Sequence, residues 1–315
     1  MKKRTAIDLG SSTIRVLGPG SGEIAVSPAC AALECVSGKP VCFGLEAWQS
    51  SRRMPGSVDL VYPLFEPERV TSTVLEGLFG AMARLLGKDG RFRTDLVLAL
   101  PASVLPEQEG AYPEAASLLG AKDVYIVNGL HAASRSVAHA EEGVTVLVHI
   151  GASVCEIGAY QEGKCLASNI LPIGGRAFDD LLGVYVYDRY QLLLDADGAE
   201  DLKKRLSGAS ELPGTMTVAG IQRKTGLPIR CELETSVLCQ VLTHAYQHIT
   251  GPLLELVGVS GQCPAMIWLT GGSAPVIGLK EAISRVLPDS EVKIADEPWD
   301  AVIRGLDEMI VCREV

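Results

Sequence analysis

Aromatic residues and long apolar runs are scarce in this 315-residue sequence. Phe, Trp and Tyr make up 5% of it although 47% of the residues are hydrophobic, so the core must be mainly aliphatic, as in sheets covered by helices. We find no run of about 18 apolar residues that would cross a membrane as a helix. The charged start Met1–Arg4 has no apolar signal segment behind it. We therefore expect a cytoplasmic protein with one large or two smaller α/β domains.

Positive charge is also in short supply. The sequence has 28 Lys and Arg against 38 Asp and Glu, a net charge of −10. A nucleic-acid partner is not expected, because binding phosphate backbones needs clustered Lys and Arg. Whether the surface contacts a membrane stays open.

The nine cysteines are scattered, and no C-x-x-C pair occurs among them. This usage indicates reduced thiols, and we expect Cys155 and Cys165, which flank a predicted strand pair, to be core residues. His244 and His248 are four residues apart on a predicted helix but lack the glutamate of H-E-x-x-H and a third ligand. A zinc site is therefore not expected.

The chain's most informative stretch is Ala6–Arg15, AIDLGSSTIR, an apolar strand that runs into a glycine turn. Gly10 permits a backbone that a side chain would forbid. Asp8 lies near the strand end, where a carboxylate can hold the water shell of Mg²⁺. Outward N–H and hydroxyl groups suit a phosphate loop, and here three residues supply them: Ser11, Ser12 and Thr13. A turn-capping carboxylate with plain turn hydroxyls explains the same residues.

The same layout occurs again in Thr145–Tyr160, TVLVHIGASVCEIGAY. Gly151 matches Gly10 and Ser153 matches Ser12, while His149 stands where Asp8 was. A third glycine turn closes the apolar strand of Met266–Ser273, MIWLTGGS. Three such turns predict two similar α/β domains facing one nucleotide.

Apolar spacing predicts the remaining elements. Strands are expected at Asp95–Leu100 and Glu291–Ile294, the latter at a sheet edge, and a polar loop at Ser50–Gly56. The main helices are expected at Glu66–Leu86, Glu107–Leu119, Asn128–Ala140, Phe178–Tyr190, Glu232–Leu256 and Asp300–Ile310.

Taken together, these stretches resemble the actin and heat-shock-chaperone ATPase superfamily, and within it the MreB family of bacterial actins. LPIGGRAFD at Leu171–Asp179 is similar to the MreB pattern R-I-G-G-D-x-F-D and is the most specific match. The resemblance spans nearly the whole chain and also rests on AIDLGSST, LVLALP (Leu96–Pro101), AKDVYIV (Ala121–Val127), AEDLKKRLSGA (Ala199–Ala209), LTGGS (Leu269–Ser273) and EPWDAVIRG (Glu297–Gly305).

The resemblance implies an actin-like α/β fold with two related domains around a nucleotide cleft, each a mixed sheet flanked by helices. One domain would take residues 1–141 with the C-terminal helix 300–315, and the other residues 142–299. ATP or ADP would bind with Mg²⁺ held by Asp8. The implied nucleotide contacts are Gly10, Ser11, Ser12, Thr13 and Arg15 in the first domain, and Gly151, Ser153, Gly174, Gly175, Glu200, Lys203, Gly271, Gly272 and Ser273 in the second.

Plainer explanations stand beside three of these contacts. Arg15 is equally explained as a strand-surface salt bridge. The charges at Glu200 and Lys203 also suit a solvated helix face. His149 suits a half-buried histidine hydrogen-bonded to a loop.

Three departures from the family pattern bear on hydrolysis and shape. The second loop reads H-I-G-A-S-V from His149, where the family has D-I-G-G-G-T. Asn128 stands where the family places the water-orienting glutamate of E-P-x-A-A; an amide cannot act as a base, but it can orient water. The Tyr62–Val70 segment is several residues shorter. We therefore expect the two catalytic positions, Asn128 and His149, to be degenerate and hydrolysis to be weakened or lost.

Two classes of function fit these features. The first is a cytoskeletal filament or scaffold that self-associates head to tail with nucleotide bound. The second is a non-polymerising actin-fold accessory or chaperone-like protein, of the EutJ kind. A partner subunit that co-assembles with an active bacterial actin is a third possibility.

Overall fold

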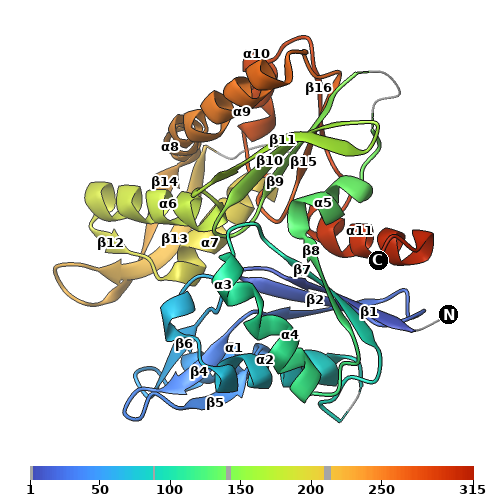
Figure 1. Cartoon of the computed structure of the whole chain (residues 1–315). Coiled ribbons are helices and arrows are strands. Elements are labelled where there is room, and N and C mark those ends of the chain that lie inside the picture. Colours follow the sequence, from blue (N-terminus) through green and yellow to red (C-terminus); the bar gives the residue numbers. More distant parts are fainter. Residues whose placement is uncertain (1–2, 88, 140–142, 209–213) are drawn as a thin grey trace. The chain divides into compact units, whose positions relative to one another are not determined.

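The computed structural model describes residues 3–87, 89–139, 143–208 and 214–315. The chain divides into two compact units (Figure 1). Unit 1 consists of Met1–Ala138 and Asp300–Val315, and unit 2 of His139–Trp299. Each unit has its own mixed five-stranded sheet and its own apolar core. The prediction of mixed sheets flanked by helices is confirmed.

The main sheet of unit 1 has the strand order β3-β2-β1-β7-β8. The central strand β1 (Arg4–Leu9) pairs antiparallel with β2 (Thr13–Leu17) and parallel with β7 (Asp95–Leu100). At the edges, β3 (Ile24–Pro28) pairs antiparallel with β2 and β8 (Val124–Asn128) pairs parallel with β7. Every residue of β7 is buried, as expected for a strand covered on both faces.

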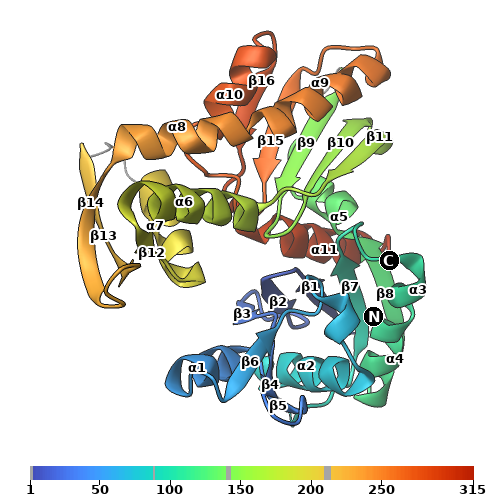
Figure 2. The same cartoon turned by 90° about the vertical axis from the view of Figure 1, so that its left-hand side faces the viewer.

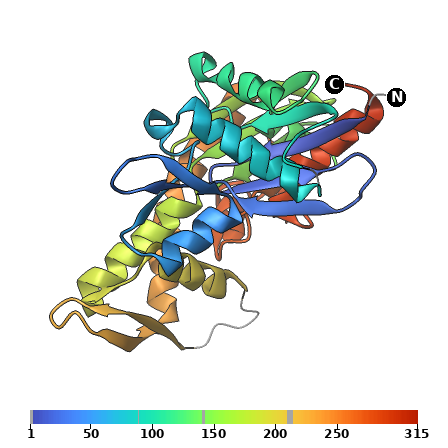
Figure 3. The ribbon, with the colours of Figure 1, turned by 90° about the horizontal axis from the view of Figure 1, so that it is seen from below.

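Helices cover both faces of this sheet. On one face, α2 (Ser72–Leu85) and α4 (Ala111–Leu118) lie side by side (Figure 3) and share a core with alternate residues of β1 and β2. On the other face, α11 (Ala301–Cys312) crosses α5 (Gly129–Arg135). Gly305 permits this crossing, because a Cβ there would collide with the carbonyl oxygen of Ala132. The C-terminal segment thus packs within unit 1.

Unit 1 also contains a smaller antiparallel sheet. α1 packs against this sheet over Ala47 and Trp48. The strand order is β5-β4-β6, and the elements are β4 (Ala31–Glu34), β5 (Pro40–Phe43), α1 (Leu45–Arg53) and β6 (Val58–Val61).

The main sheet of unit 2 repeats the order and the strand directions of unit 1. Its order is β11-β10-β9-β15-β16. Like β1, the central strand β9 pairs antiparallel on one side and parallel on the other. The strands are β9 (Thr145–Ile150), β10 (Cys155–Gln161), β11 (Lys164–Leu171), β15 (Met266–Thr270) and β16 (Glu291–Ile294). The repeat seen in the two sequence stretches therefore extends to whole sheets.

Three helices of unit 2 form a bundle beside its second sheet (Figure 2). These are α6 (Gly175–Tyr190), α7 (Ala196–Gly208) and α8 (Thr235–Ala245). α9 (Gln247–Ser260) covers β10 and β11, and α10 (Leu279–Val286) packs on α9 and β16. The second sheet contains β12 (Leu192–Leu193), β13 (Thr215–Gln222) and β14 (Pro228–Glu234).

Several predicted helix bounds were wrong. The helix predicted from Glu66 begins at Ser72, because the Thr71 hydroxyl caps it by accepting the Val74 N–H at 3.3 Å. A short 3₁₀ turn, η1 (Pro67–Arg69), precedes it. The polar stretch from Ser50 continues α1 as far as Arg53.

The longest predicted helix, Glu232–Leu256, is also wrong as a single element. Its first residues, Glu232–Glu234, are the last residues of strand β14, in which side-chain burial alternates with the period of a strand. The remaining residues are helical and divide at Tyr246 into α8 and α9. The helix predicted for Asn128–Ala140 ends at Arg135, and its last position lies outside the described residues.

The structure also bears on the cysteines and on membrane-spanning helices. Cys155 is buried in β10, but Cys165 is exposed, because it lies on the edge strand β11. All nine cysteines are free thiols. Over the described ranges we find no helix that is both long and apolar enough to cross a membrane.

Candidate functional site

A backbone hydrogen bond closes the turn between β1 and β2. The Gly10 N–H donates to the Thr13 carbonyl oxygen at 3.1 Å, and a Cβ at Gly10 would lie 2.9 Å from that oxygen. Ser11 is buried, whereas Ser12 and Thr13 are half-buried. Within the described chain the hydroxyls of Ser12 and Thr13 make no hydrogen bond, so both are available to a ligand.

Beside this turn, Arg15 is held between two carboxylates of unit 1. Its Nε donates to Asp300 Oδ1 at 2.8 Å, and its Nη1 lies 3.9 Å from Asp8 Oδ2. These side chains are only 12% to 15% exposed. Burial raises the pKa of the Asp8 carboxyl to about 6; Arg15 opposes this rise and Asp300 adds to it. Arg15 thus serves as the internal counter-charge of Asp8 and Asp300.

The turn between β9 and β10 has the same closure as the first. The Gly151 N–H donates to the Val154 carbonyl oxygen at 2.9 Å. The acidic and the basic residue type exchange places around it, however. In the strand register Asp8 is opposite Arg15, whereas His149 is opposite the buried Glu156.

The first turn of α6 rests directly on this second glycine turn. The N–H groups of Gly175 and Arg176 donate to the carbonyl oxygens of Gly151 and Ala152, both at 2.9 Å. A Cβ at Gly174 would lie 2.6 Å from the Ala152 oxygen. Glycine is required for this close approach, and two helix N–H groups that would otherwise lack partners are satisfied within unit 2.

Lys203 of α7 ties the start of α6 in place. Its Nζ donates to the Gly175 carbonyl oxygen at 2.8 Å and lies 2.8 Å from Asp179 Oδ1. Burial raises the pKa of Asp179, and Lys203 opposes that rise. Glu200, by contrast, pairs with Lys204 at 2.8 Å on the solvated side of α7. Of the two predicted α7 residues, only Lys203 reaches the glycine turns.

The third glycine turn packs on the second. Gly271 has a φ of +90°, and a Cβ there would collide with the carbonyl oxygen of Ile150. The Ser273 N–H donates to that same oxygen at 3.2 Å, while Gly272 is exposed. Unit 2 therefore gathers most of its predicted residues in one place: Gly151, Gly174, Gly175, Lys203, Gly271 and Ser273.

The family profile described as "MreB/Mbl protein" matches residues 2–314. The chain belongs to the MreB/Mbl family. Two of its relatives are described as cell shape-determining proteins. Mbl of Bacillus subtilis is 24% identical over 96% of this chain and 94% of its own length. MreB of Escherichia coli is 23% identical over 95% of this chain and 91% of its own length.

Solved structures confirm the actin-like fold. MreB5 of Spiroplasma citri bound to ADP superposes with a TM-score of 0.88 at 19% identity, covering 100% of this chain and 98% of its own. The same protein bound to AMPPNP gives a TM-score of 0.84. A non-polymerising mutant of MamK bound to AMPPNP gives 0.63 at 17% identity, covering 96% and 97%.

Asn128, one of the departures from the MreB family pattern, is the N-cap of α5. Its Oδ1 accepts the His131 N–H at 3.1 Å, and the residue is exposed. The side-chain oxygen is therefore used in stabilising the helix start, an interaction typically worth about 1 kcal/mol. The amide has no basic atom to offer a water molecule.

His149, the other departure, is half-buried at the end of β9. Its Nδ1 lies 3.1 Å from the Thr270 hydroxyl at the end of the neighbouring β15. The plainer interpretation, a half-buried histidine hydrogen-bonded beside a loop, agrees with this geometry. An imidazole is a poor ligand for a hard cation such as Mg²⁺.

Few side chains are placed to bind the magnesium ion that the resemblance to the MreB family implies. In the part of the chain that the structure describes, no group of three or more His, Cys, Asp or Glu side chains is arranged to hold a metal. Mg²⁺ commonly takes one or two carboxylates, waters and substrate phosphates. The Asp8 carboxylate fits that pattern as a single ligand or water-shell acceptor, in competition with Arg15.

Sequence reasoning missed three residues that complete these clusters. Asp300 holds Arg15, Asp179 holds Lys203, and Thr270 holds His149. Two of them had a signal: Asp179 closes the L-P-I-G-G-R-A-F-D stretch and Asp300 follows the E-P-W stretch. Thr270 precedes the third glycine turn, but its role depends on the pairing of β15 with β9.

Proposed function

We propose that this protein is a nucleotide-binding bacterial actin that assembles as a cytoskeletal filament or scaffold. The observation that carries the proposal is the pair of glycine turns closed by matching hydrogen bonds, Gly10 to Thr13 and Gly151 to Val154. Support comes from the family, whose relatives are described as cell shape-determining, and from MreB5, whose structures contain ADP and AMPPNP.

In this proposal each unit supplies its own set of nucleotide contacts. In unit 1, the hydroxyls of Ser12 and Thr13 contact phosphate oxygens, and Asp8 orients the magnesium water shell. In unit 2, Gly272 offers an exposed backbone and Ser273 a nearby hydroxyl. Bound Mg²⁺ would neutralise phosphate charge. Lys203 and Arg15 act as positioning residues, because their charges already pair within the protein.

We further propose that hydrolysis is slow. Asn128 cannot accept a proton from water, and its Oδ1 already caps α5. His149 pairs with Thr270 instead of presenting a second carboxylate. The loss of a general base typically costs about 10²–10⁴ in rate.

Sedimentation with negative-stain microscopy tests the assembly part of the proposal. The purified protein is compared without nucleotide, with ADP and with ATP, all in Mg²⁺ buffer. We expect ATP-dependent filaments in the wild type and in Asp289→Ala, a control at an exposed carboxylate. Asp8→Ala should form few or none. Monodisperse wild-type protein under every condition would contradict the filament proposal.

A second candidate is a partner subunit that polymerises only with an active bacterial actin, or a non-polymerising accessory protein. The altered residues Asn128 and His149 favour it, because a co-assembling subunit does not need its own hydrolysis. Mixing the protein with an active MreB separates these outcomes. Co-sedimentation only in the mixture supports the partner subunit, whereas no co-sedimentation supports the accessory protein.

A further inference from the structure

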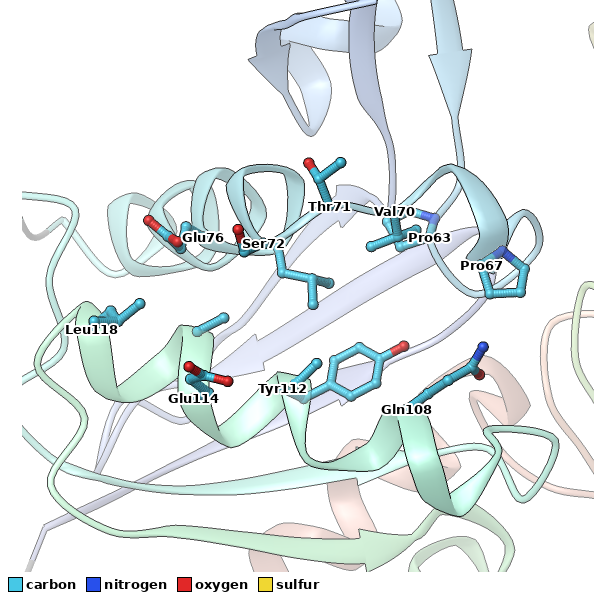
Figure 4. A pocket seen from close by; sticks show the side chains of 13 residues that line it. Pro63, Pro67, Val70, Thr71, Ser72, Glu76, Gln108, Tyr112, Glu114 and Leu118 are labelled. Carbon is cyan, nitrogen blue, oxygen red and sulfur yellow. The ribbon is translucent and has the colours of Figure 1, made fainter.

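Unit 1 contains an open groove of about 340 Å³ between α2 and α4. Figure 4 shows the two helices as its walls, with η1 at one end. Leu75 and Ala115 are buried at its base, and Val70 and Leu118 line it. Leu118 is 60% exposed, so the groove presents a large apolar side chain to solvent.

The charge along this groove is of one sign. Glu76 of α2 and Glu114 of α4 lie on opposite walls near one end (Figure 4), and no Lys, Arg or His is among the described residues that line the groove. Neither carboxylate has an ion-pair partner among the described residues. More acidic side chains flank it: Glu68 in η1, and Glu107 and Glu109 in α3 (Pro106–Glu109). Nearby Arg69 is already paired with Asp59 and Glu66.

A polar side chain without a partner points into the same groove. Tyr112 is 5% exposed, and its hydroxyl lies between Gln108 and the proline-containing η1 end (Figure 4). It makes no hydrogen bond with any described residue. Burial raises the pKa of Tyr112 to about 12, so the hydroxyl stays protonated and can donate a hydrogen bond. The hydroxyl is therefore available to donate a hydrogen bond to an acceptor on an occupant of the groove.

We propose that this groove docks a short basic amphipathic helix from a partner protein. The apolar stripe of that helix packs on Leu75, Ala115 and Leu118. A Lys or Arg side chain of the docked helix lies between Glu76 and Glu114, and an oxygen atom of the docked helix accepts a hydrogen bond from the Tyr112 hydroxyl.

Size and chemistry support a helix as the occupant. On the wall formed by α3 and α4 the lining residues run from Gln108 to Leu118, which corresponds to about 15 Å at 1.5 Å per helical residue, or about three turns. Two helices with an apolar groove between them present the usual surface for a third helix. Unpaired carboxylates on both walls select a cationic ligand and disfavour an acidic one. The whole groove lies in unit 1, so the proposal does not depend on nucleotide binding.

Peptide titration of the full chain tests the proposal. The probe is a fluorescent 18-residue helix of Leu, Lys and Ala, with Leu at helical spacing and Lys on the flanks. Two further peptides keep the length: one replaces Lys by Glu, and one scrambles the Leu positions. We expect saturable binding of the basic helix, weakened by added salt, and at least tenfold weaker binding of the other two.

Groove variants then locate the binding. Glu76→Lys combined with Glu114→Lys should weaken the basic peptide at least tenfold and allow the acidic peptide to bind, and Leu118→Glu should weaken the basic peptide about fivefold. The matched control, Glu23→Lys with Glu255→Lys, makes the same charge change at exposed residues outside the groove and should change binding less than twofold.

Three results would overturn the proposal. These are no binding of the basic peptide, equal binding to wild type and the double groove variant, or equal binding of the acidic peptide. A loss of filament sedimentation in the double variant without any peptide binding would identify the groove as a contact between copies instead. Circular dichroism melting confirms that each variant is folded.

Discussion

Replacing Asp8 by Asn should stabilise the nucleotide-free protein at neutral pH. Asp8 is largely buried beside Asp300, and Arg15 approaches it only to 3.9 Å. Its pKa rises from 3.8 to about 6 on folding, so the folded state favours the neutral carboxyl. Above about pH 6 the protein therefore bears the cost of an ionised buried group. At about 1.4 kcal/mol for each pH unit, that cost is about 3 kcal/mol.

The pH dependence has a definite sign. A pKa raised in the folded state contributes stability that is fully present below about pH 4 and is lost as the pH rises to about 6. Asp8→Asn does not titrate. Its advantage over the wild type should therefore be near zero below pH 4, grow up to about pH 6 and stay constant above.

Urea unfolding at several pH values measures this effect on nucleotide-free protein. Asp289→Asn, at an exposed carboxylate, serves as the control and should follow the wild type. The reasoning is refuted if Asp8→Asn is less stable than the wild type at pH 7.5, because Arg15 would then stabilise an ionised Asp8. A stabilised variant that no longer binds nucleotide would mark Asp8 as a residue kept for function.

Three further predictions concern separate parts of the molecule. Arg15→Met should destabilise the protein by about 3 kcal/mol in urea unfolding, because it leaves two buried carboxylates without a counter-charge. Adding Asp8→Asn should recover part of the lost stability. An unchanged unfolding midpoint for Arg15→Met would contradict the role of Arg15 as a counter-charge. Asn128→Glu should not restore normal phosphate release in a steady-state ATPase assay, because His149 also departs from the family pattern; turnover like that of an active MreB would show that only one departure matters. Gly305→Ala should lower stability by about 1–3 kcal/mol, because its methyl group meets the Ala132 backbone where α11 crosses α5. Gly183→Ala, at a position inside α6 with open space, is the control and should be more stable than the wild type by about 0.5–1 kcal/mol, the gain in helix propensity.

Much of the fold follows from local patterns in the sequence. The three glycine turns were placed correctly because each ends a short apolar strand, a pattern that depends only on neighbouring residues. Helix bounds were less predictable. The apolar residues from Glu232 onward suit a helix and a strand alike, and pairing with β13 places the first of them in β14.

The details of the candidate site depend on contacts between distant segments. Arg15 and Asp300 are 285 residues apart in sequence, so spacing alone could not pair them. Lys203 was expected at a nucleotide, yet its charge pairs with Asp179 across two helices. Residue type and spacing predicted where the glycine turns lie, but packing decides which charges remain available to a ligand.

Titration calorimetry with ATP and ADP, with and without Mg²⁺, tests the central claim most directly. We predict one nucleotide per chain, tighter binding with Mg²⁺, and loss of that magnesium effect in Asp8→Asn. The absence of binding for both nucleotides under all conditions would contradict the account. The duplicated glycine turns would then be structural, and the function would lie in the surfaces that contact other proteins.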